Sequence, residues 1–172
     1  DDLIDSCRDV VRREVRDRGR LADLARRIEA SDLTPEAINA PFSVPSSPDP
    51  VSLLGRFLGP HAEEVALALL KRGADPHSMV ADGTVQAPIN VAAAGSPRVL
   101  QALIALGAAT AGKGLHPLCA AVEHPENVRL LLEHGADPWA KGELGANALR
   151  MCRFSFRPSA RALESLGILL WH

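Results

Sequence analysis

The sequence predicts an all-α fold built from a repeated helical unit. Aromatic residues make up only 3% of the 172 residues and tyrosine is absent, whereas β-sheets favour aromatic and β-branched side chains. Four glycines recur at intervals of roughly 28 to 34 residues, the range expected of a helical solenoid. Each glycine follows a leucine-rich stretch that a proline precedes. These proline–glycine pairs are Pro60 and Gly73, Pro97 and Gly107, Pro125 and Gly135, and Pro158 and Gly167.

Each unit is expected to contain two helices. Proline is favoured in the first turn of a helix, where its missing N–H is not needed, and glycine adopts the left-handed conformation that ends a helix. The leucine-rich stretch between them is therefore predicted to be the second helix of each unit. A shorter apolar helix precedes the proline, most clearly at residues 87–93, 116–122 and 147–152.

These motifs resemble ankyrin repeats over about residues 50–172. Ala87-Pro-Ile-Asn90 and His116-Pro-Leu-Cys119 are similar to the Thr-Pro-Leu-His sequence that opens the first helix of each repeat, and Gly73-Ala-Asp-Pro76 and Gly135-Ala-Asp-Pro138 match the Gly-Ala-Asp turn. The resemblance implies an ankyrin-repeat solenoid of about four repeats, with β-turn fingers projecting between stacked helix pairs.

The sequence departs from the ankyrin pattern in several places. The first repeat is poor, with Asp49 to Leu54 in the place of the opening sequence, and the second has Gly107-Ala-Ala-Thr110 where Gly-Ala-Asp would stand. The last unit lacks its turn and finishes on the apolar stretch 168–172, in which we expect Trp171 to pack. Terminal repeats are usually atypical because one face has no neighbour.

The chain divides into three predicted segments: a helical module at residues 1–40, a Pro- and Ser-rich linker at 41–50 and the repeats at 51–172. Apolar residues at every fourth position of the module predict a first helix that Gly19 ends. A second helix is expected from Leu21 to Ala30, and a third short one begins at Thr34-Pro35.

Two interpretations of this module stay open. In one, the module is a cap, and the apolar flank of the first repeat is covered by Leu3, Cys7, Val11, Leu24 and Ile28. In the other, the module resembles the SOCS box of ankyrin-repeat and SOCS-box proteins, which recruits Elongin B–C and a cullin to form a ubiquitin ligase. That resemblance implies Elongin-binding residues Leu3, Cys7 and Val11 and cullin-binding residues Leu33, Pro35 and Ile38.

Composition disfavours several other classes of function. The net charge is −2, and the many arginines of the first thirty residues alternate with acidic residues, as on a solvated helix surface. We therefore expect no nucleic-acid or membrane partner. Three distant cysteines and the absence of a signal peptide favour a reduced cytoplasmic or nuclear setting.

Catalytic and metal-binding motifs are missing, so we expect neither an enzyme nor a cofactor. No nucleophile elbow, zinc-protease motif or phosphate-binding loop appears. Gly112-Lys113-Gly114 is interpreted as a turn, since no strand is expected before it. Cys119, His124 and His134 lack the close spacing of zinc ligands, and His134 is expected to cap a helix C-terminus.

The resemblance places partner binding on the fingers and on the concave face formed by the shorter helices. The fingers are expected at His77–Gln86, Thr110–Leu115 and Trp139–Ala146. Trp139 is the strongest candidate, because large aromatic residues dominate interface energetics; the alternative is that it folds back over the neighbouring finger. The complete set of candidates is His77, Met79, Val80, Trp139, Lys141, Arg153 and Arg157.

Overall fold

The computed structural model describes residues 2–13, 17–43, 50–78, 80–81, 85–110, 116–141, 145, 147–154 and 159–171. Within these ranges the chain is mainly helical, as the composition predicts. It divides into two compact units, Asp1–Pro88 and Ile89–His172. Among the described residues, no helix is both long enough and apolar enough to cross a lipid bilayer.

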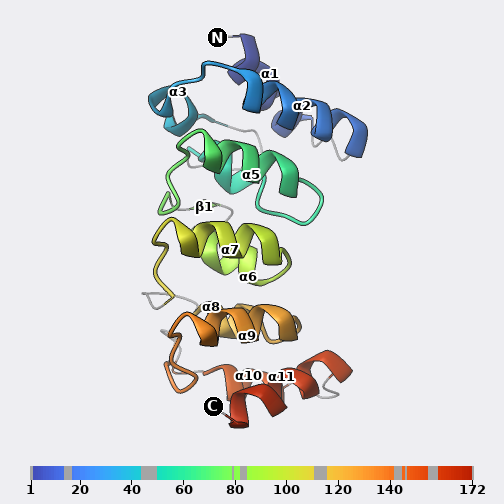
Figure 1. Ribbon diagram of the computed structural model, residues 1–172, viewed down its shortest axis with the longest axis vertical. Helices are drawn as coiled ribbons and strands as arrows, with labels where there is room; N and C mark the ends of the chain where they lie inside the picture. The colour runs from blue at the N-terminus through green and yellow to red at the C-terminus, as the bar shows by residue number, and fades with distance from the viewer. Residues whose placement is uncertain are drawn as a thin grey trace. The chain divides into compact units, whose positions relative to one another are not determined.

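The first unit consists of helices and one short β-hairpin. Its elements are α1 (Asp2–Arg12), α2 (Arg18–Ala30), α3 (Pro35–Asn39), α4 (Leu53–Arg56), α5 (Glu63–Lys71), β1 (Val80–Ala81) and β2 (Val85–Gln86). The two strands are antiparallel, with Val80 opposite Gln86. Helix α2 lies along α5, and α1 contacts both α2 and α4 (Figure 1). The pair α1–α2 therefore packs beside the pair α4–α5.

Apolar side chains at helical spacing form the core of this first unit. On α1 they are Ile4, Cys7 and Val11, all less than 9% exposed, and on α2 they include the fully buried Ile28. Polar contacts tie the end of α2 to the end of α5. Arg72 Nε donates to the Ile28 carbonyl at 3.2 Å. The apolar side of α1 and α2 thus packs on α4 and α5.

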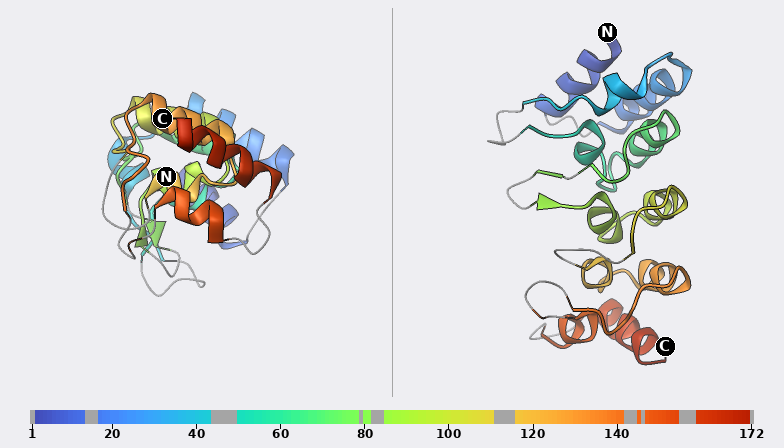
Figure 2. Two further views of the ribbon diagram at one scale, coloured as in Figure 1. Left: turned by 90° about the horizontal axis from the view of Figure 1, so that it is seen from below. Right: turned by 90° about the vertical axis from the view of Figure 1, so that its left-hand side faces the viewer.

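The second unit consists of three helix pairs in the part of the chain that is described. They are α6 (Pro88–Ala93) with α7 (Pro97–Ala105), α8 (Pro117–Ala120) with α9 (Pro125–Glu133), and α10 (Ala148–Phe154) with α11 (Ala160–Trp171). Helix α9 contacts α7 and α11, while α10 contacts α8 and α11 (Figure 2, right). Fully buried leucines fill the space between them: Leu100, Leu103, Leu118, Leu131 and Leu169.

Three glycines and two prolines confirm the predicted helix ends. Pro97 and Pro125 occupy the first positions of α7 and α9. Gly73, Gly107 and Gly135 have φ angles of 90°, 84° and 82°, in the left-handed region that glycine adopts at no steric cost. The N–H of each following alanine donates to a carbonyl near the end of the preceding helix, which satisfies one of its unpaired acceptors.

Two predicted boundaries before and within the first repeat are wrong. Gly19 lies inside α2, because the Asp17 carboxylate accepts the N–H of Arg20 at 2.8 Å and caps the helix ahead of the glycine. Pro60 lies in a turn, and α5 begins only at Glu63. Local capping thus decides where α2 begins, whereas α5 begins after Ala62 without a side-chain cap.

The predicted end of the last helix is also wrong. Gly167 lies inside α11, which continues to Trp171. Buried Ala162 and Leu169 anchor the helix on both sides of the glycine, and this packing outweighs a helix cost of roughly 0.5–1 kcal/mol. Trp171, expected to pack, is 92% exposed. Pro158 lies outside the described residues.

Helix α3 reinforces the turn that follows α5. The Asn39 side chain donates from Nδ2 to the Gly73 carbonyl at 3.0 Å and accepts the Asp75 N–H on Oδ1 at 2.8 Å. Thr34 caps α3 as predicted. Pro35, at the start of α3, lies so close that a Cβ on Gly73 would be 3.1 Å from its Cγ. Gly73 is therefore required both for its φ angle and for the space it leaves.

His116 is a buried titratable side chain at the start of α8. The residue is 3% exposed, and its Nδ1 accepts the Leu118 N–H at 3.4 Å. Its buried Nε2 has no hydrogen-bond partner among the described residues. Burial lowers the pKa of His116 below its ordinary value of 6.5, and the Asp137 carboxylate opposes this shift in part. The folded chain therefore favours the neutral imidazole.

Gly73→Ala should destabilise the first unit by more than the left-handed backbone alone explains. An L-residue in this conformation costs roughly 1–2 kcal/mol, and the contact with Pro35 adds to that cost. The measurement is the free energy of unfolding in urea for Gly73→Ala in the wild-type and Pro35→Ala backgrounds. We expect a smaller loss in the Pro35→Ala background; an equal loss in both would contradict the packing argument.

Acid should destabilise the second unit through His116. Its pKa is lower in the folded than in the unfolded chain, so the unfolded chain takes up the proton first. This contribution to stability is complete above the unfolded pKa, near 6.5, and is lost as the pH falls below it. His116→Thr keeps a capping oxygen that does not titrate. Between about pH 7 and about pH 5, urea unfolding should show a larger loss of stability for the wild type than for His116→Thr. If the free energy of unfolding falls equally with pH in the wild type and in His116→Thr, protonation of His116 makes no contribution to acid destabilisation.

Candidate partner-binding surface

The two Gly-Ala-Asp-Pro turns share one geometry. In the first, the Asp75 carboxylate accepts the N–H of His77 at 2.9 Å. In the second, the Asp137 carboxylate accepts the N–H of Trp139, also at 2.9 Å. A carboxylate that bonds to the backbone two residues on holds the chain in a turn of fixed shape. His77 and Trp139 therefore occupy equivalent positions, two residues after the aspartate of each turn.

Trp139 is 60% exposed on this turn. The N–H of Ala140 donates to the Asp137 carbonyl at 3.1 Å, so the backbone on both sides of the indole is hydrogen-bonded within the turn. Lys141, two residues further on, is also exposed. The second unit thus exposes a large aromatic side chain, followed by a cation. The backbone that carries the aromatic side chain is already held by hydrogen bonds, so little conformational entropy would be lost there on binding.

In the first unit His77 is exposed, and Ser78 Oγ donates to the Asp75 carbonyl at 2.9 Å. The neighbouring candidates are described only in part. Val80 begins β1, but its side chain is not described, and Met79 lies outside the described residues. The described candidate of this finger is therefore His77.

Two further candidates come from the last repeat. Arg153 lies in α10, although its side chain is not described, and Arg157 lies outside the described residues. The remaining finger, predicted at Thr110–Leu115, is described only at Thr110. Its turn lacks the aspartate, since Ala109 stands in that position, although Gly107 keeps its left-handed φ of 84°.

The N-terminal candidate residues lie mainly in the interior of the first unit. Cys7 and Val11 are buried between the helices, and Leu3 is half-buried. Burial raises the pKa of the Cys7 thiol to about 11, against the opposing effects of Arg27 and Arg8. A thiol with such a pKa is unreactive at neutral pH.

The residues that resemble a cullin-binding stretch also contact the chain itself. Ile38 is 1% exposed, and Leu33 is half-buried. Pro35 is exposed, yet one side of its ring faces Gly73. These positions support the turn after α5 through α3.

Several charges of the first two helices are paired with neighbours on the same helix. Ion pairs one turn apart join Arg8 to Asp5 at 3.4 Å and Arg26 to Asp23 at 3.2 Å. The Arg8 guanidinium also lies 5.6 Å from the centre of the Phe42 ring, within the range of a cation–π interaction. This pattern agrees with the solvated surface that the sequence predicts.

The residues considered as metal ligands serve other purposes. Cys119 is buried in α8, His124 Nδ1 lies 3.8 Å from a Glu126 carboxylate oxygen, and His134 Nδ1 lies 2.8 Å from the Leu130 carbonyl. The last contact fits the predicted helix C-cap. Among the described residues, no group of three or more His, Cys, Asp and Glu side chains could hold a metal ion.

Comparison with known proteins adds one finding. The ankyrin repeat family model matches residues 113–143, a range that includes α8, α9 and the turn carrying Trp139. No curated protein matches the chain. The helix pairs and the left-handed glycine turns agree with the family match, which supports an ankyrin-repeat protein.

Proposed function

We propose that this chain is a non-enzymatic protein-interaction module whose partner contacts the finger turns, with Trp139 as the main contact of the second unit. The ankyrin family match supports the class of function, because ankyrin repeats suggest protein–protein interaction. The observation that carries the proposal is an indole side chain, 60% exposed, on a turn fixed by its own hydrogen bonds.

The energetics of association favour this arrangement. A tryptophan side chain can bury roughly 150–250 Å², and apolar area contributes about 25 cal/mol per Å². The gain is several kcal/mol before the cost of ordering the contact is subtracted. That cost is lower where the backbone is already held in place. The cation of Lys141 favours a partner that carries an acidic group near its apolar contact.

His77 is the proposed contact of the first unit, because it occupies the equivalent position of its own turn. The predicted array of about four repeats is part of the same proposal. The recurrence of the glycine turn at Gly73, Gly107 and Gly135 supports it. A partner that spans several fingers would then gain affinity from contacts that are individually modest.

Trp139→Ala should weaken partner binding while leaving the fold intact. Loss of a central interface tryptophan costs about 2 kcal/mol or more, or at least about thirtyfold in affinity. The assay immobilises the full chain and quantifies proteins retained from its native cell extract by mass spectrometry. Far-UV circular dichroism and the melting temperature verify the fold.

The matched control is Leu106→Ala, which removes another exposed apolar side chain at the end of α7. Leu106→Ala should retain the same partners as the wild type. If Trp139→Ala retains them equally well, the indole is not the main contact and the proposal fails.

We further propose that α1 and α2 cap the first repeat. The burial of Ile4, Cys7 and Val11 inside the unit supports this interpretation. The competing hypothesis is an adaptor that recruits Elongin B–C and a cullin. It requires Leu3, Cys7 and Val11 to contact another chain, and two of these three are already buried by their own helices. The half-buried Leu3 is the residue that separates the two hypotheses.

Under the capping proposal, the chain should not co-elute with purified Elongin B–C on size exclusion. Ile4→Ala should instead lower the free energy of unfolding by about 2–5 kcal/mol, because it removes a buried side chain. Co-elution that Leu3→Asp abolishes would establish the adaptor and overturn the cap.

A further inference from the structure

The start of α8 lies beside the turn that carries Trp139. Helices α8 and α9 follow each other after a short connection and pack against each other (Figure 1). Two such helices form a hairpin and run in opposite directions, so the first residue of one lies next to the end of the other. His116, the N-cap of α8, is therefore close to the turn that follows α9.

His116 uses one ring nitrogen and leaves the other without a partner. Nδ1 accepts the Leu118 N–H at 3.4 Å, and a ring nitrogen that accepts carries no proton, so the neutral ring has its proton on Nε2. This Nε2 is buried and has no hydrogen-bond partner among the described residues. A proton added to Nδ1 would therefore remove the cap of α8 and place a cation in the interior.

The Asp137 carboxylate connects this ring to the exposed indole. Burial lowers the pKa of His116, and the negative charge of Asp137 opposes that shift. The same carboxylate accepts the backbone N–H of Trp139 at 2.9 Å. One side chain thus acts on a buried titratable group and also holds the backbone that presents Trp139.

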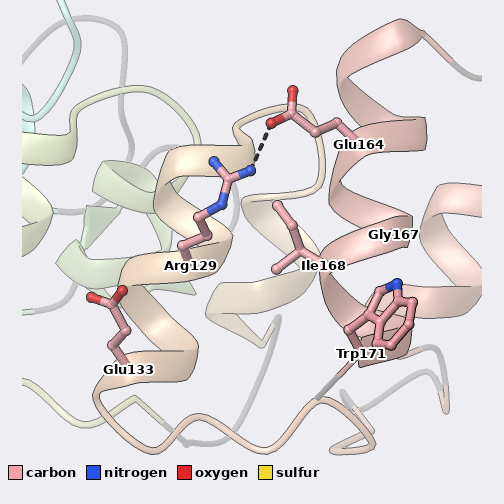
Figure 3. A pocket seen from close by; sticks show the side chains of 6 residues that line it. All are labelled: Arg129, Glu133, Glu164, Gly167, Ile168 and Trp171. Carbon is pink, nitrogen blue, oxygen red and sulfur yellow. Dashed lines mark hydrogen bonds and ion pairs between the residues drawn. The ribbon is translucent and has the colours of Figure 1, made fainter.

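The charged groups of α9 and of the connection before it are engaged elsewhere or exposed. In the connection, Glu123 accepts a hydrogen bond from Ser159, and His124 Nδ1 lies 3.8 Å from a Glu126 carboxylate oxygen. On α9, Arg129 pairs with Glu164 of α11 at 2.8 Å, as Figure 3 shows. The remaining groups at the end of α9, which are Glu133 and His134, are exposed.

The other helix that packs on α8 is α10. Its described charged side chain, Arg150, is exposed. Burial raises the pKa of the Cys119 thiol on α8 and of the Cys152 thiol on α10, so both stay uncharged at neutral pH. Among the described groups, Asp137 is therefore the counter-charge for a protonated His116.

We propose that protonation of His116 loosens the turn that presents Trp139, because the Asp137 carboxylate moves from the Trp139 N–H to the buried imidazolium. A cation in the interior requires a counter-charge, whereas the backbone N–H of an exposed residue can bond to water instead. The loosened turn must be ordered again when a partner binds, which weakens the contact of the indole. The effect on binding rests on the proposed function of Trp139, and the effect on the turn does not.

The test follows the backbone amide and histidine ring NMR signals of the isotope-labelled full chain from about pH 8 to about pH 5. The backbone N–H signal of Trp139 should move upfield, because it loses its hydrogen bond to the carboxylate. The Leu118 N–H signal should move as well, because Nδ1 no longer accepts. Both should share the midpoint of the His116 ring, which should lie below 6.5.

Two variants and one control separate the steps. His116→Thr keeps a capping oxygen that does not titrate, so the Trp139 signal should stay in place over this range. Asp137→Asn keeps a side-chain oxygen that can hold the turn but lacks the charge. The Trp139 signal should then no longer follow His116, and the midpoint of His116 should fall. The matched control, His134→Gln, removes an exposed histidine near the turn and should retain the response.

A second measurement applies if acid unfolds the chain before His116 is protonated. The free energy of unfolding in urea should then fall more between about pH 7 and about pH 5 in Asp137→Asn than in the wild type. The reason is that loss of the carboxylate lowers the pKa of His116 in the folded chain and leaves the unfolded chain unchanged. An equal fall in both proteins rejects the coupling.

Binding is tested by retaining proteins from the native cell extract on the immobilised chain. The wild type should retain severalfold less partner at about pH 5.5 than at about pH 7.5, and His116→Thr should show a smaller difference. Equal differences in the two proteins reject the effect on binding.

Two further results overturn the coupling. One is a Trp139 N–H signal that does not move while the His116 ring titrates. The other is a response that persists in folded Asp137→Asn. Failure of the proposed function is distinguishable from both, because it shows as equal retention of partners by Trp139→Ala and the wild type, whereas the titration of the turn is measured without a partner.

Discussion

The chain reversal at the left-handed glycines is the constraint on which the rest of the structure depends. Gly73, Gly107 and Gly135 each follow the second helix of a pair and reverse the chain with a left-handed φ angle. The alanine after each glycine is less than 9% exposed, so its methyl group lies in the interior. At Gly73 and Gly135 the helix end, the buried alanine and the aspartate of the turn lie within three residues. The end of the helix and the exposure of the side chain after the turn therefore have a common origin.

Much of the fold could be predicted because these turns are local. The glycine and proline positions in α7 and α9 require only neighbouring residues, and the sequence alone indicates them. Gly167 also follows a leucine-rich stretch, yet it continues a helix because buried residues of α11 on both sides of it are packed in the core. The start of α2 was missed for a related reason: the Asp17 cap overrides Gly19. Predictions failed where tertiary packing or a cap outweighed residue preference.

Among the functional and supporting residues, those that depend on a local motif could also be predicted, and those that depend on distant segments could not. The exposure of Trp139 could be predicted, since it follows from a four-residue motif. The role of Asn39 could not. Its role depends on α3 returning to within hydrogen-bond distance of Gly73 and Asp75, which no local pattern in the sequence indicates.

The exposure of both tryptophans has a practical consequence. Tyrosine is absent and the chain has only two tryptophans, which are 60% and 92% exposed. Intrinsic fluorescence therefore comes from indoles that are already hydrated in the folded chain, and unfolding changes their surroundings little. The same emission becomes a sensitive reporter of anything that covers either indole. In this protein, tryptophan fluorescence reports what the surface contacts more directly than whether the core is formed.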